Sequence, residues 1–304
     1  MRQDVEFVSN GTRCAGWLFE GDNDDLAGRA GKPCVVMAHG FGATKDAGLL
    51  PFAERFAAAG VTVLVFDYRG YGTSRGMPKQ HVSHWRHRAD YRAALRFVRA
   101  LPGVDRDRVA LWGSSYSGGH VLPVAASDGN IAAVISQGAA MDGLVAVLEI
   151  LRYAGPVQLA RLVGHGLRDA LGALAGLAPH LIPVVGPPGT VAAITAAGSE
   201  SGYQNIMGPT FRNEMCARGV LAIALNRPVL AAGKLDCPVF LLVAEEDNIC
   251  PPSAVRAAAR RLGGRAEVHA YPCGHFDIYV GEVFESSVVK QVEFLRKRLA
   301  PLAG

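Results

Sequence analysis

Short apolar segments recur along the chain, and most of them are apolar at nearly every position. Strands buried on both faces, as in a parallel sheet, have this pattern. In contrast, the segment from Asp4 to Glu20 alternates polar and apolar residues around the turn sequence SNGT, which predicts a strand pair at a sheet edge. The runs predicted to be buried strands are 34–40, 61–70, 108–113, 131–138 and 237–247.

Segments with the composition of helices separate these runs. Because strands and helices alternate along the chain, the pattern predicts right-handed crossovers and a doubly wound, mostly parallel α/β sheet. Ligands of such sheets bind at the carboxyl ends of the strands. The predicted helices fall within 47–60, 85–103, 118–129, 253–264 and 283–301.

The alternation stops between residues 142 and 234, where Ala, Gly, Leu and Pro dominate. We therefore predict a core domain formed by 1–141 and 235–304, with a helical cap or lid inserted at 142–234. Residues 170–198 contain no Asp, Glu, Lys or Arg, so a membrane span has to be considered. Their four prolines argue against one continuous helix of about 20 residues, and we expect an apolar wall over a substrate and no membrane span.

Composition narrows the class of protein. With 50% hydrophobic and 19% charged residues among 304, the chain can bury a large core. Its formal charge of +4 is too small to indicate a nucleic-acid surface. No apolar secretory signal follows the first residues, and the six cysteines form no CxxC pair. We expect a cytoplasmic protein with free thiols, without a zinc site or disulfides.

Three serines stand together in RVALWGSSYSGGH, residues 108–120. A buried strand that runs into Gly113 and then into a helix of small residues is the setting of a G-x-S-x-G nucleophile elbow, which makes Ser115 the nucleophile. Ser117 then occupies the fifth position of the motif in place of glycine, where a small side chain is needed. Two alternatives stay open: Ser117 as the nucleophile, or three small turn residues without chemistry.

A serine hydroxyl becomes a useful nucleophile when a histidine accepts its proton and a carboxylate orients that histidine. The segment LLVAEEDNICPP leaves one predicted strand with Asp247, and AEVHAYPCGHFDIY leaves the next with His275. The order Ser115, Asp247, His275 is the one that an elbow on this sheet requires. The carboxylates of Glu245 and Glu246 remain alternatives to Asp247.

These segments together resemble the α/β-hydrolase superfamily, from about residue 11 to the C-terminal helix except for the insertion. The sequence HGFG at 39–42 is also similar to that family. The resemblance implies that the backbone N–H groups of Phe41 and Tyr116 form an oxyanion hole. It also implies that FDYRGYGTS, residues 66–74, is a structural turn. The glycine-rich motifs of nucleotide binding are incomplete, so no cofactor is expected.

The predicted activity is that of a serine hydrolase that cleaves a carboxylic ester or thioester through an acyl-enzyme on Ser115. The apolar insertion indicates a small-molecule acyl substrate with an apolar group. Two other functions stay open, an acyltransferase that uses the same triad and a non-catalytic ligand-binding protein on the same fold. The sequence also leaves open a homo-oligomer.

Two further sets of residues invite a chemical interpretation. Residues 81–90 carry four candidate metal ligands at spacings of three. Because Arg86 and Arg88 lie among them, we predict a solvated cationic helix face and no metal. Cys250 and Cys273 stand in the two loops that would carry Asp247 and His275, and we interpret them as incidental thiols. The four candidate ligands are His81, His84, His87 and Asp90.

Overall fold

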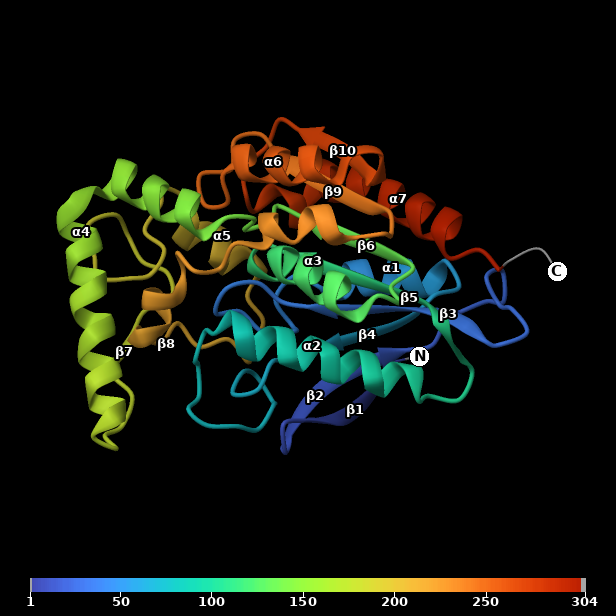
Figure 1. The fold of residues 1–304 in the computed structure, drawn as a ribbon, viewed down its shortest axis with the longest axis horizontal. Helices are drawn as coiled ribbons and strands as arrows, with labels where there is room; N and C mark the ends of the chain where they lie inside the picture. Colours follow the sequence, from blue (N-terminus) through green and yellow to red (C-terminus); the bar gives the residue numbers. More distant parts are fainter. Residues whose placement is uncertain (1, 302–304) are drawn as a thin grey trace.

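The computed structural model describes residues 2–301, in which eight strands form one mixed sheet (Figure 1). Its order is β1-β2-β4-β3-β5-β6-β9-β10, and the strands from β4 to β10 are parallel. The predicted sheet class and all five predicted buried strands are confirmed. The strands are β1 Arg2–Ser9, β2 Thr12–Phe19, β3 Lys32–Ala38, β4 Thr62–Phe66, β5 Val104–Ser114, β6 Ala133–Gln137, β9 Val239–Ala244 and β10 Ala266–Tyr271.

The predicted edge hairpin is also present. Strands β1 and β2 pair antiparallel with Ser9 opposite Thr12, and β2 then pairs antiparallel with β4. The two turn residues, Asn10 and Gly11, have φ values of 45° and 73°. Turns of this hand match the twist of the strands, and Asn-Gly is the pair that adopts them at least cost.

Helices cover both faces of the sheet. Neighbouring residues of a strand point to opposite faces, so in β3 Val35 belongs to one apolar core and Val36 to the other. Helices α1 (Leu50–Ala58) and α7 (Gly281–Arg298) pack on the core with Val35. The other face is covered by α2 (His84–Arg99), α3 (Tyr116–Asp128) and α6 (Pro252–Leu262).

The chain leaves the sheet after β6 and returns to it at β9. The long helix α4 (Gly143–Leu174) follows β6 and lies along the left edge of Figure 1. The predicted division into a core and a cap at 142 and 234 stays a prediction, although residues 143–234 add no strand to the eight-stranded sheet. This segment further contains α5 (Ser199–Ile206), the short pair β7 (Leu181–Ile182) and β8 (Met215–Cys216), and the 3₁₀ turns η1 (Ala217–Ala222), η2 (Pro228–Leu230) and η3 (Ala232–Lys234).

Helix α4 is interrupted at Gly155, whose φ of 79° and ψ of 172° are not helical, and Pro156 follows. By length and composition, α4 is the one helix in the described part of the chain that could cross a membrane, which is weak evidence by itself. The segment 170–198 considered above contains only the last turn of α4; it is otherwise β7 and loops. The absence of a membrane span stays a prediction.

The solvated cationic face predicted for residues 81–90 is wrong. His84, His87 and Asp90 are buried, and the ring of His87 stacks on that of Tyr68 with centroids 4.0 Å apart. The carboxylate of Asp90 accepts hydrogen bonds from the side chains of Ser9 and Arg69. The loop after β4 and the edge hairpin cover this side of α2, a contact between distant segments that helical spacing cannot indicate.

Candidate active site

A strained turn between β5 and α3 presents one serine. Ser115 has φ 58° and ψ −121°, a conformation that residues with a side chain rarely adopt. Its backbone is held from the neighbouring strand, because Ser115 N donates to Gln137 O and Ala140 N donates to Ser115 O, both at 3.0 Å. A Cβ at position 113 would collide with the carbonyl of Ser117, so the turn needs glycine there.

The three serines of this turn have different partners. Ser114 Oγ lies 2.6 Å from the hydroxyl of Tyr279 and accepts a hydrogen bond from Gln137. Ser117 Oγ donates to Ala38 O at 2.7 Å and accepts from Ser114 N at 2.9 Å, so it ties the turn to β3. Of the three, only Ser115 Oγ faces a histidine. The geometry therefore favours Ser115 over Ser117 as the nucleophile.

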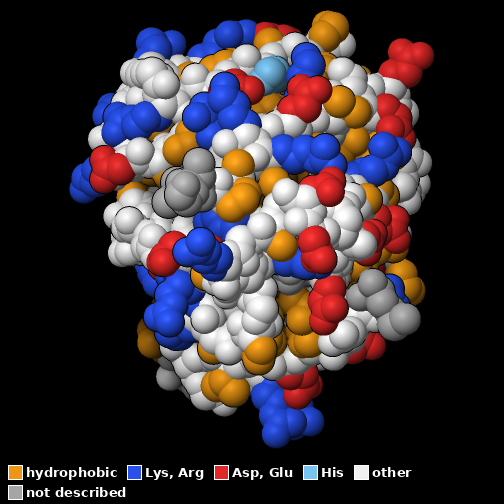
Figure 2. Space-filling view, turned by 90° about the vertical axis from the view of Figure 1, so that its right-hand side faces the viewer, with side chains coloured by type: hydrophobic (Ala, Val, Ile, Leu, Met, Phe, Trp, Pro, Cys, Tyr) orange, Lys and Arg blue, Asp and Glu red, His pale blue; other side chains and the backbone are white. Residues whose placement is uncertain are grey.

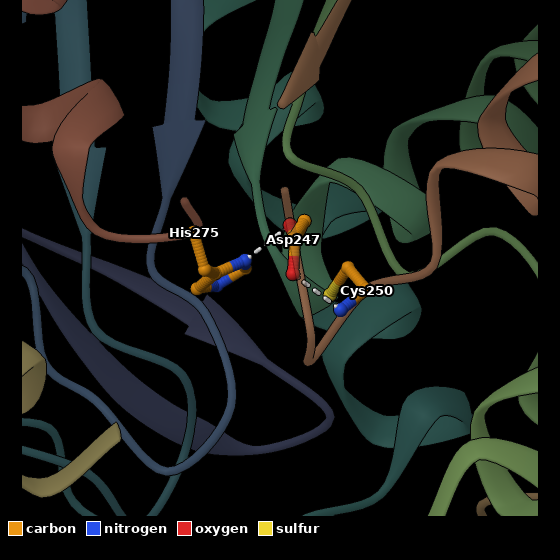
Figure 3. Close-up of side chains that lie close together, drawn as sticks. All are labelled: Asp247, Cys250 and His275. Carbon is orange, nitrogen blue, oxygen red and sulfur yellow. Dashed lines mark hydrogen bonds and ion pairs between the residues drawn. The ribbon is translucent and has the colours of Figure 1, made fainter. Parts of the chain in front are cut away.

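That histidine and an aspartate come from the loops after β10 and β9. Ser115 Oγ lies 3.0 Å from His275 Nε2. His275 Nδ1 donates to Asp247 Oδ2 at 2.6 Å, as Figure 3 shows. All three side chains are buried. The structure therefore brings together the three predicted catalytic residues, and a hydrogen bond to Asp247 leaves Nε2 of a neutral His275 free to accept the hydroxyl proton.

Two backbone amides fix the orientation of Asp247. Its Oδ1 accepts from Ile249 N at 2.8 Å and from Cys250 N at 2.7 Å, the latter drawn in Figure 3. The alternatives are placed elsewhere: Glu245 pairs with Arg256 and, like Glu246, is exposed to solvent. Asp247 is therefore the carboxylate that the fold aims at the imidazole.

The backbone amides of Phe41 and Tyr116 are free to bind a ligand. Tyr116 is the first residue of α3, where helical N–H groups have no acceptor within the helix. Within residues 2–301, neither of the two amides donates to a protein acceptor. The aromatic rings of the two residues contact edge to face, with centroids 5.2 Å apart.

Sequence reasoning missed the residues that hold the loop of Phe41 in place. His39 Nδ1 lies 3.1 Å from Gly40 O, the carbonyl of the peptide whose N–H belongs to Phe41. Burial lowers the pKa of His39 to about 4, so its neutral ring can donate from Nδ1 while Nε2 accepts from Tyr68 N. Tyr203 of α5 donates to Phe41 O at 2.8 Å. The position of His39 in HGFG was the only available signal for either residue.

A cavity of about 690 Å³, its opening to solvent included, lies between the elbow and parts of residues 143–234. Most of its lining is apolar, and Glu149 of α4 is its one charged side chain. Glu149 Oε1 lies 3.6 Å from a guanidinium nitrogen of Arg152, an exposed residue that does not line the cavity. The lining comprises Phe41, Ser115, Tyr116, Ala140, Gly143, Ala146, Glu149, Ile150, Tyr153, Ala193, Ile194, Ile223, Asn226, Asn248, Ile249 and Cys250.

Cys250 lines this cavity, with its sulfur 3.9 Å from Ser115 Oγ. Burial raises the pKa of the Cys250 thiol well above its usual range, which keeps it protonated. Its sulfur, a carboxylate oxygen of Asp247 and a ring nitrogen of His275 lie within 4.8 Å of one another (Figure 3), so these three residues could hold a metal ion. Because the carboxylate and the ring already bind each other, the absence of a metal stays our prediction.

The fold and this serine-containing turn define a class of protein. Residues 35–284 match the alpha/beta hydrolase family, and the chain belongs to that family.

Among its relatives, the quorum-quenching protein AidA of Acinetobacter baumannii is 37% identical over 98% of this chain and 95% of its own length. The thiohydrolase aneE of Aspergillus aculeatus is 28% identical over 98% of this chain and 93% of its own length. The crystal structure of the alpha/beta hydrolase GrgF from Penicillium sp. sh18 superposes with a TM-score of 0.82 at 24% identity, covering 98% of this chain and 99% of GrgF. GrgF is also described as a polyketide transferase.

Proposed function

We propose that this protein is a serine hydrolase that cleaves a carboxylic ester or thioester with a neutral, largely apolar acyl group. The observation that carries the proposal is the hydrogen-bonded series Ser115, His275 and Asp247 at the wall of an apolar cavity. The relative named as a thiohydrolase supports the reaction class.

Catalysis proceeds in two half-reactions. Ser115 Oγ attacks the carbonyl carbon while its proton passes to His275 Nε2, and the amides of Phe41 and Tyr116 stabilise the oxyanion. The intermediate collapses as the imidazolium protonates the leaving alcohol or thiol, which leaves an acyl-enzyme. Water then attacks the acyl carbon as it loses a proton to His275. The imidazolium returns this proton to Ser115 Oγ as the acid is released. Asp247 stabilises the imidazolium in both halves without taking a proton.

The cavity indicates the kind of acyl group. Apolar walls favour burial of hydrocarbon. The carboxylate of Glu149 repels an anionic substrate group nearby. Among the lining residues there is no Lys or Arg whose side chain could neutralise such a group. The proposed chemistry uses only side chains, backbone amides and water, and it needs no cofactor.

Acyl transfer to an alcohol or amine is the second candidate. It uses the same acyl-enzyme, and the relative described as a polyketide transferase favours it. Product analysis in the presence of a competing alcohol distinguishes the two: release of free acid supports hydrolysis, whereas a predominant new ester supports transfer.

The first experiment is intact mass spectrometry after incubation with a fluorophosphonate. We expect one adduct on the wild type and on Ser117→Ala, and none on Ser115→Ala. Activity is then measured with neutral p-nitrophenyl esters and thioesters of increasing acyl length. A wild type that takes no adduct, although it is folded, would contradict the proposal and favour a ligand-binding protein.

A further inference from the structure

The second half of α4 presents an apolar stripe to solvent. Exposed small or apolar residues recur there at alternating spacings of three and four, which places them on one side of the helix. Figure 1 shows no other element outside this helix at the left edge of the molecule. The stripe consists of Val157, Ala160, Gly164, Leu167, Leu171 and Leu174, and Leu177 continues it; the exposed fractions reach 65% at Leu171 and 87% at Leu174.

The opposite side of the same half-helix is attached to the protein. Leu162, Gly166 and Asp169 are buried there, and Gly166 leaves room for Leu221 of the neighbouring η1 turn. The carboxylate of Asp169 accepts from the backbone N–H groups of His180 and Arg218 at 2.8 and 2.9 Å. The helix is therefore held by one side, and its apolar stripe faces outward by construction.

The fully exposed charged side chains of α4 are all cationic. Arg152, Arg161 and Arg168 are the exposed charged residues of α4, whose residues are all described. Of its two acids, Glu149 is half-buried and pairs with Arg152, and Asp169 is buried. Arg161 and Arg168 therefore have no acidic partner among the described residues. The opposite end of the molecule differs: Figure 2 shows Lys, Arg, Asp and Glu side chains intermixed among small apolar patches.

We propose that this stripe, with Arg161 and Arg168 beside it, docks on the surface of an anionic phospholipid membrane. Leucines that enter the headgroup boundary and cations that meet lipid phosphates are the two contributions by which an amphipathic helix lies on a membrane. The helix lies on the bilayer and does not span it, because Gly155 interrupts it and its inner side carries the buried carboxylate of Asp169.

A second copy of the chain fits this face less well. A two-fold interface places a patch against itself. Arg161 and Arg168 would then meet cations, with no exposed acid of α4 to compensate. An anionic bilayer satisfies the leucines and the arginines together.

The helix that carries the stripe also contributes to the cavity. The first half of α4 contributes Gly143, Ala146 and Ile150 to the cavity wall. Binding itself does not require catalysis, so it can be measured whether or not the proposed function is correct.

The test is cosedimentation of the full chain with vesicles made of equal parts of phosphatidylglycerol and phosphatidylcholine, compared with phosphatidylcholine alone. We expect binding to the anionic vesicles that is at least tenfold stronger and that weakens with salt. The double variant Arg161→Gln/Arg168→Gln should bind about thirtyfold more weakly, and the triple variant Leu167→Gln/Leu171→Gln/Leu174→Gln should lose binding. The matched control, Val268→Gln/Val289→Gln, replaces exposed valines elsewhere and should bind as the wild type does.

Circular dichroism and thermal unfolding check that each variant is folded, and the arginine variant remains informative if the leucine variant is not. Equal binding to both vesicle types, or no binding, overturns the proposal. So does light scattering that shows a dimer of the wild type and a monomer of the folded leucine variant, since the stripe would then be covered by a second copy.

Discussion

The elbow of Ser115 and the second half of α4 are both rich in small and apolar residues, but the elbow is enclosed by other segments whereas one side of the helix faces solvent. The elbow is held from all sides, with its neighbours Ser114 and Ser117 hydrogen-bonded to other segments and its backbone tied to β6. The stripe on α4 is held from one side and leaves leucines in water.

This difference separates two uses of the same kinds of residue. The positive φ of Ser115 persists because contacts with the surrounding segments enforce it. The strained turn thereby fixes the position of the Ser115 hydroxyl. The stripe needs no exact geometry, because burial of apolar surface is non-directional. Changes near the elbow should therefore alter the rate of the reaction, whereas changes on the stripe should alter association.

The largest effect is expected for Asp247→Asn. The asparagine side chain still fits between the backbone N–H groups of Ile249 and Cys250 and the imidazole of His275. It no longer stabilises the imidazolium, and it favours the wrong tautomer of His275. By analogy with other triads, kcat should fall by about 10⁴-fold, measured with a neutral p-nitrophenyl ester. The control is Asp277→Asn in the same loop as His275; an equal loss there, with Asp247→Asn active, would assign the carboxylate to Asp277.

A smaller effect is expected for His39, which we interpret as a positioning residue for the Phe41 amide. His39→Phe removes the donor to Gly40 O, so kcat should fall by about 10- to 100-fold with little change in KM, in the range of losing part of an oxyanion hole. His39→Asn keeps an N–H donor near Nδ1 and should recover much of the rate. A loss that is equal in both variants, or that lies entirely in KM, would contradict this role.

Ser117→Ala tests the elbow through stability. The change leaves Ala38 O and Ser114 N without their buried partner, so the free energy of unfolding should fall by about 1–3 kcal/mol, measured by urea denaturation. The fluorophosphonate adduct on Ser115 should remain. Ser286→Ala, at an exposed position of α7, is the control and should change stability little.

The smallest effect is expected at the rim of the cavity. Glu149→Gln removes the charge of the one charged residue that lines the cavity. The kcat/KM for an ester with an anionic acyl tail should therefore rise about three- to fivefold, which corresponds to a partly screened Coulomb interaction. The rate with a neutral ester of equal length should not change. Glu200→Gln, an exposed acid outside the cavity, is the control; an equal response of both variants would mean that only net charge matters.

Much of the fold could be predicted from local patterns in the sequence. Continuous apolar runs and one alternating segment identified the strands of the main sheet except β10. Such patterns are local because the burial of a strand is visible in the side chains of a few consecutive residues. The chain order of Ser115, Asp247 and His275 indicated the site, since loops that follow parallel strands meet at one edge of the sheet. Their hydrogen-bonded geometry could not be read from order alone.

Contacts between segments distant in sequence were decided only by the tertiary structure. The burial of His87 and Asp90 depends on the loop and hairpin packed over α2, and the support of Phe41 depends on Tyr203, 162 residues away. The outward stripe on α4 exists because η1 covers the other side of that helix. Sequence patterns report the preferences of neighbouring residues, whereas these properties depend on which distant surface each side chain meets.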